Sequence, residues 1–142
     1  MLEKFPTHAY VPGENARHPE GAFDPILGTA QPGMSEAALA NSDAFQMGLR
    51  YLKRGFYWEA HEVLEPVWMA CPPNAVSRSV VQGLIQLANA RLKVKMGKPK
   101  AAARLFDIAR KHLAAADNAT VLGITASAFL KEIDIEIVQY NT

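Results

Sequence analysis

The fold is constrained most by residues 76–96, which are apolar around most of a helical circumference. Five of its polar side chains fall in one narrow stripe, and most of the remaining surface is apolar: the five are Arg78, Gln82, Gln86, Asn89 and Lys93. A helix with so little polar surface must be surrounded by other elements. The chain is therefore expected to build a helical bundle around this segment.

Residues that start and stop helices divide the neighbouring sequence into further helical segments. Ser35 and Ser42 are both suitable N-caps for a first helix, and Gly55 is a suitable C-terminal cap. Other helices are expected over 56–69 and 99–116, the second of these with Pro99 in its first turn. The sequence predicts an all-α fold, a compact bundle of helical hairpins with about five helices.

The last segment is ambiguous by pattern. Ile133, Ile135 and Ile137 alternate with acidic residues, which is typical of a strand, whereas Phe129, Leu130, Ile133 and Ile137 also share a helical face. No other segment offers a convincing partner strand. We therefore predict a helix, preceded by a loop over 117–126.

Residues 1–34 differ from the rest of the chain. The first 33 residues hold five of the nine prolines and four of the nine glycines, so regular structure is not expected there. They also carry Phe5, Tyr10, Phe23 and Ile26, which a purely solvated tail would rarely contain. We predict an extended arm over 1–34 that packs on a single helical domain over 35–142.

Composition excludes several classes of function. The chain has 142 residues, a length that suits one domain, and a formal net charge of +1 without a basic tract, so no nucleic-acid partner is expected. No stretch has the length of a signal peptide core or a membrane span. Cys71 is the only cysteine, which suits a reducing compartment, and we expect a cytoplasmic protein.

The segment 56–69 carries an unusual concentration of aromatic and ionisable residues. His61 and Glu65 are four residues apart, so they should meet at the edge of the apolar face of the helix. Trp58 and Trp68 flank this pair and Glu62 adds a second carboxylate, whereas Glu59 lies farther round the helix. Such a cluster attracts a cation, a proton or a positively charged partner.

The polar stripe of residues 76–96 is the expected opposite wall of this site. Arg78 could form a bidentate pair with Glu62 or Glu65. The predicted ligand-binding pocket between the two helices is lined by Trp58, Glu59, His61, Glu62, Glu65, Arg78, Gln82 and Gln86. For His8 and His18 on the arm we expect a solvated loop; the alternative is that His18 closes over the cluster.

The segment FYWEAHEVLEPVW, followed by VVQGLIQLANARLKVKMGKPKAAARLF, resembles the domain-of-unknown-function 309 family. The similarity covers about Gly48 to Leu113 and implies an all-helical domain without an established activity. The positions that match the family's motifs are Glu59, His61, Glu62, Glu65, Trp68, Gln82 and Gln86. Pro66 departs from the family pattern, in which a residue that favours helix follows the last glutamate.

Three alternatives stay open beside simple binding. His61 and Glu65 could be two ligands of a divalent metal, with His8, His18 or His112 as the third. Glu62 or Glu65 beside His61 could serve acid–base catalysis, as in a hydrolase. The cluster could also be a purely structural polar network in a protein-interaction module.

The interpretation that we favour is a binding protein. Its pocket would bind a small ligand, a cation or a segment of a partner protein. Trp58 on the carboxylate side of its helix favours a contact surface. The apolar content of the arm and the last helix favours a homodimer.

Overall fold

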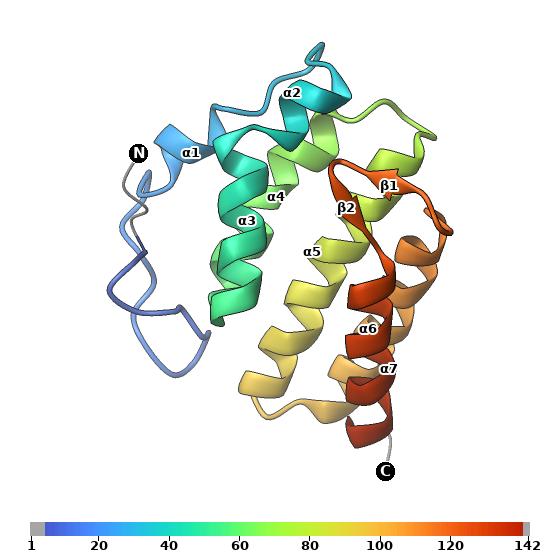
Figure 1. Cartoon of the computed structure of the whole chain (residues 1–142). Helices are drawn as coiled ribbons and strands as arrows, with labels where there is room; N and C mark the ends of the chain where they lie inside the picture. Colours follow the sequence, from blue (N-terminus) through green and yellow to red (C-terminus); the bar gives the residue numbers. More distant parts are fainter. Residues whose placement is uncertain (1–4, 141–142) are drawn as a thin grey trace.

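The computed structural model describes residues 5–140 and confirms the all-α fold (Figure 1). Residues 1–4 of the predicted arm lie outside the described residues. The elements are α1 (Asp24–Leu27), α2 (Glu36–Ala40), α3 (Asp43–Arg54), α4 (Tyr57–Ala70), α5 (Val76–Lys95), α6 (Pro99–Ala114), β1 (Thr120–Val121), β2 (Ile124–Thr125) and α7 (Ser127–Tyr140). Within the described residues, no helix is long and apolar enough to cross a membrane.

Both candidate N-caps are used, so two helices stand where the sequence suggested one. The Ser35 hydroxyl accepts a hydrogen bond from the backbone N–H of Ala38, and the Ser42 hydroxyl accepts one from Phe45. Gly55 ends α3 in the left-handed region, at a φ of 89°, where a side chain would be strained. This turn reverses the chain and sets α4 antiparallel beside α3.

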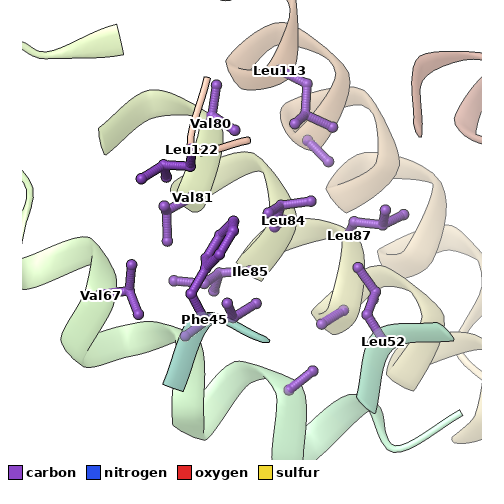
Figure 2. Close-up of a cluster of buried hydrophobic side chains, with 14 of the residues drawn as sticks. Phe45, Leu52, Val67, Val80, Val81, Leu84, Ile85, Leu87, Leu113 and Leu122 are labelled. Atoms are coloured by element: carbon purple, nitrogen blue, oxygen red, sulfur yellow. The ribbon is translucent and has the colours of Figure 1, made fainter. Parts of the chain in front are cut away.

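The helix α5 lies at the centre, as its apolar circumference predicts. It packs between α4 and α6, while α3 covers α4 and α7 covers α6 (Figure 1). Figure 2 shows the core around it, with Phe45 of α3 and Val67 of α4 facing Val81 and Ile85 of α5. The α5–α6 pair is especially close, because a Cβ on Gly83 would lie 2.7 Å from Leu113 Cγ.

The C-terminal part follows the helical prediction with one addition. The predicted loop contains a two-residue hairpin, in which Leu122 and Gly123 both have positive φ and turn the chain between β1 and β2. The ambiguous last segment is helix, with Ile133 fully buried on the side that faces the bundle. Ile135 points away from the core and is exposed, as a helical period requires.

The described part of the arm lies along the outer side of α3 and α4 (Figure 1). Phe5, Phe23, Ile26 and Leu27 are partly buried against the core, which explains why so many large apolar groups occur in a proline-rich segment. The arm also contains α1, a four-residue helix that the sequence did not predict; Pro25 stands in its first turn.

An ion-pair cluster fastens α7 to the bundle. The Arg91 Nε of α5 donates to Glu136 Oε1 of α7 at 3.0 Å, and Arg91 Nη2 lies 3.8 Å from Glu132 Oε1. Burial raises the pKa of Glu136 above its ordinary value, although Arg91 opposes this shift. The carboxyl therefore depends on Arg91 to stay ionised at this position.

Replacement of Arg91 by Met should lower the free energy of unfolding by about 2–4 kcal/mol at pH 7, because it leaves the Glu136 carboxylate half-buried without its guanidinium. Removing Arg91 raises the Glu136 pKa further in the folded state alone. The loss is therefore absent at pH values below the ordinary glutamate pKa and grows as the pH rises through the raised pKa. Urea denaturation at several pH values measures this dependence.

Arg110→Met is the matched control for this experiment. Arg110 pairs with Asp107 and Asp134 on the solvent side of α6 and α7, so its loss should cost less than about 1 kcal/mol. Equal losses in the two variants would contradict a special role for the Arg91 cluster.

Candidate functional site

The centre of the candidate site is the carboxylate of Glu59, which is fully buried. From the helical period this residue was expected farther round α4, away from the apolar face. It is covered because the arm packs over that side of the helix and removes it from water. A charge in such a position requires partners, because burial without them costs several kcal/mol.

The arm supplies both partners that the structure gives to this carboxylate. The backbone N–H of Tyr10 donates to Glu59 Oε2 at 2.8 Å, and Nε2 of His18 lies 2.6 Å from the same oxygen. The His18 side chain is only 8% exposed. The expectation of a solvated loop at His18 is therefore wrong, and the alternative, in which His18 closes over the α4 cluster, is what the structure contains.

His18 is itself held by the shape of the arm. Its ring lies 4.6 Å from the ring of His8, and Nε2 of His8 lies 2.6 Å from the carbonyl oxygen of Ala16. Asn15 links the same turn to Ala9 and Val11 through its side-chain amide. These local bonds close the arm into a loop that presents His18 to α4.

The second oxygen of Glu59 has no hydrogen-bond partner among the described residues, although it is buried. The charge of Glu59 reaches Tyr51, whose pKa is raised to about 12 by burial and, secondarily, by this carboxylate. Tyr51 therefore keeps its proton throughout the physiological range. Glu59 Oε1 remains an unused acceptor inside an otherwise apolar wall.

Aromatic rings surround the His18–Glu59 pair. Trp58 packs against Tyr10 with ring centroids 5.2 Å apart, against His18 at 5.9 Å and against Phe23 at 6.1 Å. Phe23 also contacts Tyr51. Rings of this kind exclude water and strengthen the electrostatic interactions beside them.

A cavity of about 520 Å³ opens beside this wall, between the arm and α4. Its aromatic side is formed by Trp58, Phe23 and His18. Its charged groups are three carboxylates and one guanidinium, those of Glu20, Asp24, Glu62 and Arg17. The Arg17 guanidinium lies over the ring of Trp58, 5.7 Å from its centroid. We call this cavity the arm pocket.

His61 and Glu65 meet as their spacing predicts, with His61 Nε2 3.5 Å from Glu65 Oε2. Their side chains are 32% and 51% exposed, so the pair lies on the surface of α4. Across residues 5–140, no group of three or more His, Cys, Asp and Glu side chains is arranged to hold a metal ion. Of the three histidines considered as a third ligand, His18 contacts Glu59, His8 packs against His18, and His112 lies beside Ser79 of α5.

The remaining predicted site residues lie elsewhere. Arg78 donates to the carbonyl oxygen of Cys71 at 3.2 Å and stacks on Trp68, in place of the predicted pair with Glu62 or Glu65. Gln82 lines a second groove together with Arg78 and Trp68. Gln86 is half-buried on α5 and lines neither this groove nor the arm pocket. Pro66 stands inside α4, which continues through it from Tyr57 to Ala70.

The predicted set of eight residues is thus distributed over three places. Trp58, Glu59 and Glu62 belong to the arm pocket or its wall, His61 and Glu65 to the surface of α4, and Arg78 and Gln82 to the second groove; the eighth residue, Gln86, lies in none of these places. The sequence did not identify five further residues as part of the site: Tyr10, Arg17, Glu20, Phe23 and Asp24. All five are on the arm, whose path no helical period describes; its excess of aromatic side chains was the available signal.

Comparison with known proteins supports the family resemblance and indicates no activity. The fold and the site define a small helical domain with an arm-covered carboxylate. Residues 45–105 match the model of the domain of unknown function DUF309, which confirms the resemblance to this family. The match spans α3, α4 and α5 and the first half of α6, and it leaves out the arm. No curated protein and no solved structure is significantly similar to the chain.

Two glutamates of α4 each pair with a histidine, Glu59 with His18 and Glu65 with His61, and the two pairs allow a matched comparison. His18→Ala should lower the free energy of unfolding by about 3 kcal/mol, because it leaves Glu59 buried with a single hydrogen bond. His61→Ala removes an exposed pair and should cost less than about 1 kcal/mol. Urea denaturation measures both, and trypsin should cleave the arm after Arg17 faster in His18→Ala alone. Equal effects in both measurements would show that His18 does not fasten the arm.

Proposed function

We propose that the protein binds a small organic cation, such as a substituted ammonium group, in the arm pocket. The observation that carries this proposal is the combination of an aromatic wall with three carboxylates around one cavity of about 520 Å³. Cavities that bind small molecules commonly have volumes of roughly 300–1,000 Å³. The sequence left three kinds of ligand open: a small ligand, a cation or a segment of a partner protein. The proposal selects a small organic cation.

The two kinds of side chain recognise different properties of such a ligand. The face of an indole ring attracts a cation through its quadrupole, and a substituted ammonium group also buries apolar surface against it. Trp58 offers this face, and Phe23 continues the wall. The carboxylates of Glu62, Glu20 and Asp24 add long-range attraction and select against anions.

Arg17 supports the proposal in a specific way. Its guanidinium lies over Trp58, which is the place that a ligand cation would take. The arm therefore carries an internal cation that shields the ring when no ligand is bound. A ligand must displace Arg17 or share the pocket with it, so this residue should oppose binding.

The test uses Trp58 as the reporter. In a Trp68→Phe background, titration with benzyltrimethylammonium should change the fluorescence of Trp58 and reach saturation, whereas its neutral isostere neopentylbenzene should bind at least several-fold more weakly. Glu62→Gln should weaken cation binding by about two- to fivefold, which corresponds to about 0.5–1 kcal/mol. Glu65→Gln is the matched control, one turn away on α4 and outside the pocket, and should leave the affinity unchanged.

Arg17→Gln should change the affinity in the opposite direction. It removes both the competing group on Trp58 and a like charge, so the cation should bind about two- to fivefold more tightly. Equal affinities for the cation and neopentylbenzene, or a loss of affinity in Arg17→Gln, would contradict the proposal.

Acid–base catalysis is the second candidate, and the His18–Glu59 contact favours it. A carboxylate that holds one imidazole nitrogen fixes the orientation and tautomer of the ring, as in hydrolases that use His as a base. His18 lines the arm pocket, so a ligand bound there would lie beside its ring. An activity that is lost in His18→Gln while cation binding persists would favour this candidate over simple binding.

A homodimer through α7 is a further part of the proposal. Ile135 and Val138 are 70% and 69% exposed and lie three residues apart on one face of this helix. Burial of two such side chains in each subunit would supply part of a dimer interface. Sedimentation equilibrium should detect a dimer that dissociates in Ile135→Glu, and a monomeric wild-type protein would contradict it.

A further inference from the structure

A second cavity of about 460 Å³ lies at the turn between α4 and α5 and reaches α6. We call it the turn groove. It is lined by Trp68, Pro73, Asn74, Ala75, Arg78, Ser79, Gln82 and His112. Unlike the arm pocket, its lining contains no carboxylate; its polar side chains are a guanidinium, two amides, a hydroxyl and an imidazole. The charged side chain of the turn groove is thus a cation, whereas most of those in the arm pocket are anions.

Arg78 is held in place before any ligand arrives. Its guanidinium stacks on the ring of Trp68, 4.3 Å from the centroid, and Nη1 donates to the carbonyl oxygen of Cys71 at 3.2 Å. No described carboxylate forms an ion pair with it. The guanidinium is therefore half-buried and fixed in direction.

The neighbouring polar groups are fixed as well. The Ser79 hydroxyl donates to the carbonyl oxygen of His112 at 2.9 Å, and its oxygen lies 3.4 Å from Nδ1 of the same residue. Gln82 follows Arg78 by four residues, so its amide lies one turn farther along the same face of α5. The groove thus joins α5 to α6 through the contact of Ser79 with His112.

We propose that the turn groove is a second binding site, for a small organic anion that carries a carboxylate or phosphate group. Arg78 forms a bidentate contact with the anionic group, which its planar donor fork suits. Gln82 donates a further hydrogen bond from its amide. The apolar part of the ligand packs on Trp68 and Pro73. The site is independent of the arm pocket, which lies around Trp58 and the arm.

The experiment isolates Trp68 by the substitution Trp58→Phe and follows its fluorescence. The probes are benzoate, phenyl phosphate and the neutral benzamide. At least one of the two anions should bind with saturation, and benzamide should bind at least tenfold more weakly. Binding of phenyl phosphate alone assigns the site to phosphate esters, binding of benzoate alone assigns it to carboxylates, and binding of neither overturns the proposal.

Substitutions separate a binding role of Arg78 from a purely structural one. Arg78→Lys keeps the charge and loses the bidentate geometry, so anion affinity should fall several-fold; Arg78→Gln should lower it tenfold or more. Arg104→Gln is the matched control, because it removes an equal charge from an exposed position of α6 outside the groove. Circular dichroism and the cation titration of the arm pocket, repeated in a Trp68→Phe background, report whether each variant is folded.

An anion affinity that is equal in Arg78→Gln and Arg104→Gln, with both variants folded, would overturn the proposal. The same result would leave the arm pocket untouched, because that site is tested with a cation and with Trp58 as reporter. If instead the anion binds and the cation does not, the result supports the turn groove and contradicts the proposed function of the arm pocket.

Discussion

The buried carboxylate of Glu59 is the constraint from which the arrangement of the arm follows. A carboxylate cannot be buried without hydrogen-bond donors, and among the described residues the helical core offers Glu59 none. Tyr10 and His18 provide them from the arm, at 2.8 and 2.6 Å. The arm is therefore part of the site, since the arm pocket exists only where the arm closes over α4.

The helix α4 carries one tryptophan near each end, and each ring stacks with an arginine. Arg17 lies over Trp58 and Arg78 over Trp68, and the two rings belong to cavities of opposite chemistry. Ten residues separate them, which is about 15 Å along a helix and turns them to different sides. Arg17 comes from the arm, whereas Arg78 comes from the central helix α5. This difference explains why we assign Arg17 to competition and Arg78 to recognition.

The sequence predicted the helices because apolar period and capping residues are local properties. The central position of α5 and the boundary at Gly55 follow from spacing along the chain. Spacing left residues 127–140 ambiguous, and helix was predicted there because no other segment offered a partner strand. The His61–Glu65 contact followed in the same way, since four residues on a helix always bring two side chains together. The hairpin at Leu122 and Gly123 was missed because its positive φ at a leucine has no strong sequence signal.

The sequence by itself determined a bundle around one apolar helix, with ionisable and aromatic residues concentrated on α4. Only the tertiary structure decided which histidine meets which glutamate: His18, forty-one positions before Glu59, is buried with it, while the local pair of His61 and Glu65 stays at the surface. The physical reason is that helical spacing fixes neighbours within one element, whereas burial depends on what covers that element. The arm covers Glu59, and its irregular path is set by contacts with the folded core rather than by any repeat in its own sequence.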